Sequence, residues 1–179
     1  MHLDPGDSVA IIAPASQFRG ADRHLLERAK ELLEHWDLRV HIHVDDRHHF
    51  YLAGDDASRA NHLSQALSDN RIRALFCTRG GYGSARLEPW LKRIEVDTHK
   101  LLVGYSDFCA LQCAAMNLWP LARAIHGPNI ATNQLLDDSP EADGNRTALR
   151  DALFNPDWRI ESAVEILRPG DAAGPIVGG

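Results

Sequence analysis

The chain has 179 residues, of which 44% are hydrophobic and 7% aromatic, and its formal net charge is -6. This length and composition suit one globular domain with a continuous core, and the scattered Lys and Arg residues offer no basic patch to a nucleic-acid partner. Near the N-terminus no basic segment precedes the apolar run, which Pro14 interrupts. We therefore expect neither a signal peptide nor a membrane-spanning helix, and a cytoplasmic protein.

The first half of the chain alternates between expected strands and helices. Residues 8–13 are a short, β-branched apolar run, which predicts a buried strand. Apolar residues at helical spacing predict a helix over 21–36, and alternating residues predict a strand over 38–44. After a polar loop, residues 55–67 predict an amphipathic helix that opens with acidic residues, which suit its positive end.

The second half of the chain continues the alternation. Strands are expected over 73–78, 100–105 and 122–127, with a short helical piece reaching Leu91 between the first two and a helix over 107–119 between the last two. This order predicts an α/β fold, a mostly parallel sheet flanked by helices on both faces, because only crossover connections join parallel neighbours. We expect a flavodoxin-like or class I glutamine amidotransferase-like domain.

Three polar stretches follow predicted strands directly. They are "APAS" at 13–16, "RGGYG" at 79–83 and "GYSD" at 104–107. In open parallel sheets the ligand site lies at the carboxyl ends of the strands. We therefore expect the three stretches to form one site.

Ser106 stands where a predicted strand gives way to a predicted helix. A serine on such a turn can be a nucleophile, because the turn exposes its hydroxyl and the helix directs free N–H groups at the developing charge. Gly104 supplies the first glycine of the G-x-S-x-G pattern, but Phe108 replaces the second. Serine is also a preferred helix N-cap, and taken alone the motif favours capping.

A glycine-rich loop follows the third predicted strand. Gly80, Gly81 and Gly83 let the backbone approach a ligand closely and direct N–H groups at it. The loop is thus a candidate for a second oxyanion donor. A phosphate-binding loop would have Lys followed by Ser or Thr after its last glycine, whereas Ser84 and Ala85 follow here, so we expect no nucleotide cofactor.

Several histidines lie close together in the sequence, and one lies apart. His41 and His43 share a face of a predicted strand and His49 follows in the loop, but no recognised ligand spacing is present, so we expect a solvated strand end and no metal site. His126 ends the last predicted strand. It is either the base for Ser106 or a structural histidine that holds a loop.

The three cysteines are Cys77, Cys109 and Cys113, an odd number that predicts reduced thiols and no disulfide framework. Cys109 and Cys113 are four residues apart and would share a helix face. Small apolar residues at that spacing are far more often core than metal ligands, so we expect both in the core.

Five stretches together carry a family resemblance. They are "IIAPAS", "FYLAGDDASRANHLSQAL", "RGGYGSARL", "LLVGYSDFCAL" and "HGPN", in this order through nearly the whole chain. They resemble the LD-carboxypeptidase family, the serine peptidases whose group also holds the microcin C immunity peptidases. The resemblance implies a cytoplasmic hydrolase, homodimeric at full length, that removes the terminal D-alanine from muropeptide tetrapeptides by cutting an L,D bond during cell-wall recycling.

The resemblance also implies roles for individual residues. Ser106 would be the nucleophile, and the backbone N–H groups of Asp107 and Gly81 would form the oxyanion hole. We expect no cofactor. The residues expected to contact the substrate are Arg79, Gly80, Tyr82, Gly83, Tyr105 and His126.

The end of the chain bears on how much of such an enzyme is present. After an expected helix over 145–154, the closing "GDAAGPIVGG" resembles the beginning of the family's C-terminal domain, which carries the triad glutamate and histidine. We therefore expect an N-terminal α/β nucleophile domain over 1–165, and a linker with the truncated start of the missing domain over 166–179. Without the base, the chain alone should be nearly or wholly inactive.

Two alternatives stay open at this point. An immunity-type peptidase of the same family would cut the bond that links a peptide to a nucleotide-like acyl sulfamate or phosphoramidate. A flavodoxin-like binding domain without catalysis would use Ser106 only as a helix cap. Reaction of Ser106 with a fluorophosphonate probe in the full-length protein would exclude the second alternative.

Overall fold

The computed structural model describes residues 2–18, 22–45 and 49–159. Within these ranges five strands form one sheet in the order β2-β1-β3-β4-β5, and all four strand pairings are parallel. This is the flavodoxin-like order, so the predicted α/β fold is confirmed. The strands are β1 (Ser8–Ile12), β2 (Arg39–His43), β3 (Ile72–Cys77), β4 (Lys100–Gly104) and β5 (Ala122–His126).

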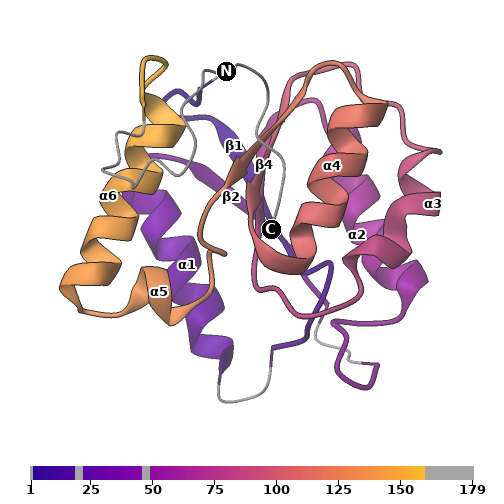
Figure 1. The fold of residues 1–179 in the computed structure, drawn as a ribbon, viewed down its shortest axis with the longest axis horizontal. Helices are drawn as coiled ribbons and strands as arrows, with labels where there is room; N and C mark the ends of the chain where they lie inside the picture. Colours follow the sequence, from indigo (N-terminus) through magenta and orange to yellow (C-terminus); the bar gives the residue numbers. More distant parts are fainter. Residues whose placement is uncertain (1, 19–21, 46–48, 160–179) are drawn as a thin grey trace, which may run out of the picture.

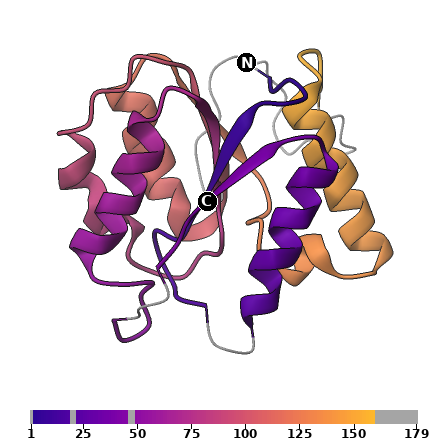
Figure 2. The same ribbon diagram turned by 180° about the vertical axis from the view of Figure 1, so that it is seen from behind.

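Helices cover both faces of the sheet, α1, α5 and α6 on one side and α2, α3 and α4 on the other (Figure 1). The view from behind shows the same two layers (Figure 2). The helices are α1 (Arg23–His35), α2 (Asp56–Ser68), α3 (Glu88–Leu91), α4 (Cys109–Leu118), α5 (Asn133–Leu136) and α6 (Pro140–Phe154), with 3-10 turns η2 (Ser84–Leu87) and η3 (Ser106–Phe108).

The strand order explains which helix lies on which face. From β1 to β2 the chain moves toward one edge of the sheet, and from β2 through β3 and β4 to β5 it moves toward the other. Because crossovers between parallel strands are right-handed, reversing the direction of travel transfers the connecting helix to the opposite face. α1 is thus alone on its face among the crossover helices, and α5 and α6 cover the rest of that face.

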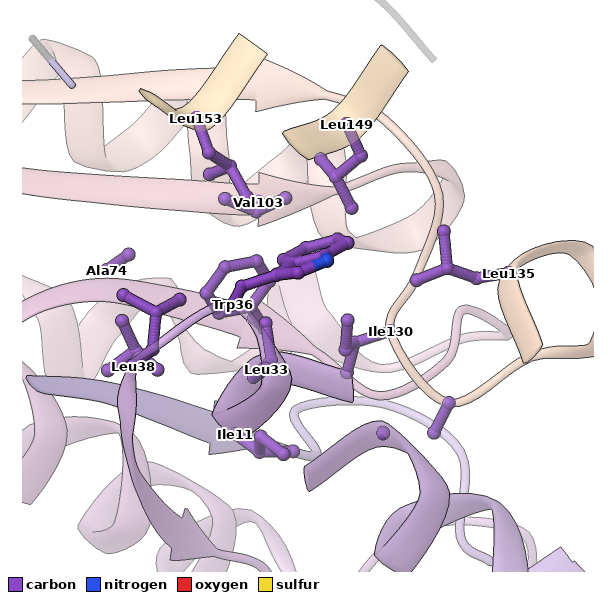
Figure 3. Packing of buried hydrophobic residues seen from close by; sticks show 14 of the residues in the cluster. Ile11, Leu33, Trp36, Leu38, Ala74, Val103, Ile130, Leu135, Leu149 and Leu153 are labelled. Atoms are coloured by element: carbon purple, nitrogen blue, oxygen red, sulfur yellow. The ribbon is translucent and has the colours of Figure 1, made fainter. Parts of the chain in front are cut away.

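Alternate residues of the central strands fill two separate cores. On the α1 side, Ile11, Phe76 and Val103 are buried with residues of α1 and α6. Figure 3 shows Leu33 of α1 and Leu149 and Leu153 of α6 in the same cluster as Ile11 and Val103. On the other side, Ile12, Leu75 and Leu102 pack with α2 and α4. Strands that are buried on both faces read as continuous apolar runs, which is the pattern of "SVAII" and "KLLVG".

The end of the described chain departs from the prediction in two places. α6 begins at Pro140, earlier than the expected 145, because Ser139 caps it by accepting a hydrogen bond from the Ala142 N–H and Pro140 suits the first turn. The short helix α5 was not expected at all. The predicted linker over 166–179 lies outside the described residues.

The prediction that Cys109 and Cys113 both belong to the core is wrong. Cys113 is exposed and Cys109 is half-buried. The buried face of α4 is formed by Leu111, Gln112 and Ala115, which leaves positions 109 and 113 on the outer side of the helix. Four-residue spacing put the two cysteines on one face but could not say which face is covered.

None of the helices in the described ranges combines the length and apolar character that a bilayer-spanning segment needs. The described residues also contain no group of three or more His, Cys, Asp or Glu side chains close enough to hold a metal ion.

Candidate active site

A cleft of about 570 Å³ opens where β1, β3, β4 and β5 end. The three polar stretches that follow predicted strands each contribute to it, so the structure brings them together as the sequence predicted. The residues that line the cleft are Ser16, Gln17, Asp22, Tyr51, Arg79, Gly80, Gly81, Tyr105, Ser106, Asn129 and Thr132.

Ser106 lies on the turn between β4 and α4 in an unusual backbone conformation. Its φ is 65°, in the left-handed region that side-chain-bearing residues rarely adopt. Such a conformation costs about 1–3 kcal/mol and persists only where the surrounding structure imposes it. The preceding Tyr105 is extended, and a 3-10 turn begins at Ser106 itself. This sharp strand-to-helix turn leaves Ser106 exposed at the edge of the cleft.

Buried polar side chains hold the turn from below. The Asn129 side chain is 1% exposed, and its Oδ1 accepts a hydrogen bond from the Tyr105 N–H at 3.2 Å. Gln112 donates through Nε2 to the Gly104 carbonyl at 3.1 Å and to the Ile125 carbonyl at 3.0 Å, which joins the ends of β4 and β5. Gly104 is required here, because a Cβ at that position would lie 2.8 Å from Asn129 Oδ1.

The glycine loop packs directly against the serine turn. A Cβ on Gly80 would lie 3.0 Å from Ser106 Oγ, and one on Gly81 would lie 1.9 Å from Ser16 Oγ. Gly81 also has a φ of 123°, which a residue with a side chain would adopt only under strain. The loop can therefore approach Ser106 and Ser16 this closely only because both positions are glycine.

Two charged side chains anchor the far end of the glycine loop. Asp107 accepts a hydrogen bond from the Ser84 N–H through Oδ2 at 2.7 Å, which ties the serine turn to the start of η2. Arg59, on α2, is 2% exposed and donates through Nη1 to the carbonyl oxygens of Pro14 and Gly83. Arg59 thus joins the loop after β1 to the loop after β3.

The predicted substrate-contacting residues fall into two groups. Arg79, Gly80 and Tyr105 line the cleft, and Gly83 and Tyr82 do not belong to its lining. Tyr82 is 60% exposed, and its ring centroid lies 6.3 Å from that of Tyr51, a cleft residue. Tyr82 is therefore at the rim, where contact with a substrate remains a prediction.

His126 lies beside the cleft, and its side-chain contacts are with Cys109 and Tyr105. Its Nδ1 is 3.4 Å from Cys109 Sγ, and its ring centroid is 6.2 Å from that of Tyr105. His126 is exposed and does not line the cleft. Burial raises the pKa of the neighbouring Cys109 thiol, so this thiol stays protonated to higher pH than a free one. The arrangement supports the structural alternative for His126 over the role of base.

Cys77 is the only cysteine of the three that is fully buried. Burial raises the pKa of its thiol, which donates to the Arg79 carbonyl at 3.3 Å. A thiol in such surroundings is unreactive. Cys77 therefore supports the start of the glycine loop and offers no competing nucleophile.

Four residues at or beside the cleft were not among the predicted site residues: Ser16, Asn129, Arg59 and Asp22. Ser16 belongs to "APAS" and Asn129 to "HGPN", two stretches that follow predicted strands. That position could have indicated both residues as part of the site. Arg59 lies inside an amphipathic helix, where an arginine normally faces solvent. Its burial depends on two loops that only the tertiary fold brings to it.

The fold and the cleft together define a flavodoxin-like α/β domain with a strained serine at the carboxyl edge of its sheet. The family model described as LD-carboxypeptidase N-terminal domain matches residues 9–127. The chain therefore belongs to the LD-carboxypeptidase family, as the resemblance implied.

Related proteins bear names that agree with this family. A Streptomyces coelicolor protein named as a carboxypeptidase is 35% identical over 185 residues, which cover 99% of this chain and 57% of that protein. The murein tetrapeptide carboxypeptidase of Pseudomonas aeruginosa is 37% identical over 124 residues, which cover 67% of this chain and 38% of that protein. Even where nearly the whole chain aligns, it spans just over half the length of the curated relative.

Solved structures share the fold. A muramoyltetrapeptide carboxypeptidase from Oxalobacter formigenes superposes with a TM-score of 0.65 at 25% identity, over 83% of this chain and 48% of that one. The structure of MccF in complex with glutamyl sulfamoyl guanosine superposes with a TM-score of 0.71 at 17% identity, over 94% of this chain and 55% of that one. At 17% identity the second likeness concerns the fold alone.

Proposed function

We propose that this chain is the nucleophile domain of a serine LD-carboxypeptidase that releases the terminal D-alanine from murein tetrapeptides. The proposal rests on the backbone conformation of Ser106. This non-glycine residue has a φ of 65° and lies on a strand-to-helix turn that opens into a cleft. A helix cap has no need of this strain, because ordinary N-cap residues take β-region angles. A serine nucleophile of this type needs the strained angle, because the sharp turn that imposes it also exposes the hydroxyl.

The chemistry would use groups already placed around the turn. Ser106 Oγ attacks the carbonyl of the L,D bond, the D-alanine leaves, and water then hydrolyses the acyl-serine. We propose the backbone N–H groups of Asp107 and Gly81 as the oxyanion donors. Asp107 and Gly80 support this assignment, because one ties the serine turn to η2 and the other packs against Ser106 Oγ.

A serine nucleophile also needs a proton acceptor. Among the cleft-lining residues of the described chain there is neither a histidine nor a glutamate. We propose that the base and its partner come from the C-terminal domain that the family resemblance implies. Removing the base from a serine triad costs several orders of magnitude in rate, so the 179-residue chain alone should be nearly or wholly inactive.

Probe labelling of the full-length protein tests the nucleophile. A fluorophosphonate should label wild type at Ser106, and the Ser106→Ala variant should not react. Ser68→Ala, an exposed serine on α2, is the matched control and should label like wild type. Labelling that persists in Ser106→Ala would refute the proposal, and so would a full-length wild type that does not react.

Release of D-alanine tests the substrate. The full-length protein should liberate it from a murein tetrapeptide, and the 179-residue chain should do so several orders of magnitude more slowly. An aminoacyl sulfamoyl nucleoside provides the comparison for an immunity-type peptidase. Faster cleavage of that compound than of the tetrapeptide would reverse the substrate assignment while leaving Ser106 as nucleophile.

Two further properties are proposed on the family resemblance alone. We place the protein in the cytoplasm, where recycled murein peptides would reach it, and we expect the full-length protein to be a homodimer.

A further inference from the structure

Arg79 is the one positively charged side chain among the cleft-lining residues in the described part of the chain. Its Nη1 binds Asp22 Oδ2 at 2.8 Å, and the two side chains are 34% and 33% exposed. A guanidinium has five N–H donors in a planar fork. Among the described residues Asp22 is its one side-chain partner, so the fork keeps donors for a ligand in the cleft.

We propose that Arg79 binds the free terminal carboxylate of the peptide substrate. This inference rests on the proposed carboxypeptidase function, because a carboxypeptidase must recognise a chain end. Arginine forms two parallel hydrogen bonds with a carboxylate, which fixes both its position and its orientation. Asp22 would hold the guanidinium in place without occupying the whole fork.

The position of Arg79 along the loop fits the geometry of such a substrate. In a carboxypeptidase substrate the scissile carbonyl and the terminal carboxylate are one residue apart, about 3.8 Å along the chain. Gly80 packs against Ser106, since a Cβ there would lie 3.0 Å from Ser106 Oγ, and Arg79 is the next residue along the loop. Arg79 and Ser106 line the same cleft, so a substrate whose scissile carbonyl lies at Ser106 can have its terminal carboxylate near the loop that carries Arg79.

A purely structural role for the pair predicts different behaviour. Asp22 directly precedes α1, so the pair could simply join that helix to the glycine loop. A partly exposed ion pair of this kind contributes little to stability. A structural pair would also make no distinction between a peptide acid and a peptide amide, and that distinction is therefore the measurement that separates the two roles.

Binding to a non-hydrolysing form of the full-length protein provides the test. In a Ser106→Ala background, calorimetry would compare a murein tetrapeptide ending in D-alanine with the same peptide carrying a terminal amide. We expect the amide to bind about 10- to 100-fold more weakly, the range expected for a charged hydrogen-bonded contact. Arg79→Met should reduce this ratio to about 2-fold or less, and Arg79→Lys should leave an intermediate ratio.

Controls make the result independent of folding. Arg71→Met removes an arginine that is likewise paired with an aspartate, Asp69, at the other end of the sheet, and it should keep the full ratio. Ser106→Gly provides a second background, because glycine adopts φ 65° freely. Equal binding of acid and amide, a ratio unchanged in Arg79→Met, or no binding of either peptide would overturn the proposal.

The test stands apart from the nucleophile assignment. Acid–amide discrimination that depends on Arg79, in a protein whose Ser106 fails to react with a fluorophosphonate, would retain the carboxylate site and reject the serine mechanism. A reactive Ser106 without such discrimination would retain the mechanism and reject the site.

Discussion

Ser106 combines an exposed hydroxyl with a backbone angle that its neighbours impose. Asn129 and Gln112 hold the Gly104–Tyr105 peptide, which directly precedes Ser106, through its N–H and its carbonyl. A side chain at Gly104 would clash with Asn129. The strain at Ser106 is therefore maintained by buried hydrogen bonds and close packing. The sequence motif alone was compatible with a simple cap, and the observed φ of 65° favours the nucleophile.

Substitution of Gly104 should show how tightly the turn is packed. Gly104→Ala is expected to lower the free energy of unfolding by about 1–3 kcal/mol, because the new Cβ meets three atoms at 2.8 Å and the φ is 154°. Gly144→Ala, in α6 with nothing within 4 Å of the added Cβ, should raise it by about 0.5–1 kcal/mol. Urea denaturation measures both. A Gly104→Ala protein as stable as wild type would contradict the close packing.

Among the secondary-structure elements, helix α2 supplies one residue that holds two loops of the site together. Arg59 lies on α2, yet its guanidinium binds the carbonyls of Pro14 and Gly83, and Asp56 on the same helix accepts from both Arg59 and Arg86. The loops after β1 and β3 are thus fixed relative to a helix on one face of the sheet. This coupling explains how loops without regular structure hold a defined cleft.

Removal of the Arg59 guanidinium should destabilise the protein markedly. We expect Arg59→Met to lower the free energy of unfolding by about 2–4 kcal/mol, since two buried carbonyls lose their donor. Arg59→Lys should recover less than half of the loss, because an ammonium lacks the fork. Arg71→Met, at a side chain 78% exposed, should change it by about 0–1 kcal/mol. Equal effects at the two arginines would show that burial of Arg59 is unimportant.

At the scale of the whole molecule, the two ends of the sheet have different roles. The carboxyl ends of the strands carry the cleft, and the opposite end carries Lys100, a fully buried residue of β4. Its Nζ donates to the carbonyls of Asp69 and Ile72, each at 2.7 Å, and closes the turn that leads into β3. Burial lowers the pKa of Lys100 to about 8 from its usual 10.5.

The lowered pKa predicts a pH-dependent contribution to stability. Between pH 8 and 10.5 the unfolded chain keeps the Lys100 proton that the folded protein has released, so this group makes the folded state more stable as pH rises. Lys100→Met has no such proton, so the free energy of unfolding of wild type should rise, relative to that of this variant, by on the order of 2 kcal/mol across that window. The thiols titrate in both proteins, so their contributions cancel in the difference between the two free energies of unfolding. A difference that stays flat or falls with pH would contradict the shift.

The alternation of apolar runs and amphipathic helices was enough to predict the fold class and the position of the site at the carboxyl ends of the strands. Both can be predicted from local sequence, because strand and helix periodicity and turn glycines are patterns of neighbouring residues. Ser106, the glycine loop and "HGPN" could therefore be assigned to one edge of a parallel sheet without coordinates. The exposure of Cys113 could not, because helix periodicity groups residues by face without saying which face is covered.

By itself, the sequence determined an α/β chain of the LD-carboxypeptidase type with Ser106 at a strand end. Only the tertiary structure decided the positive φ of that serine, the burial of Arg59 against two loops, the Arg79–Asp22 pair in the cleft and the contact of His126 with Cys109. Each of these depends on residues far apart in the chain. Their encounter is set by strand order and packing, which no local pattern encodes.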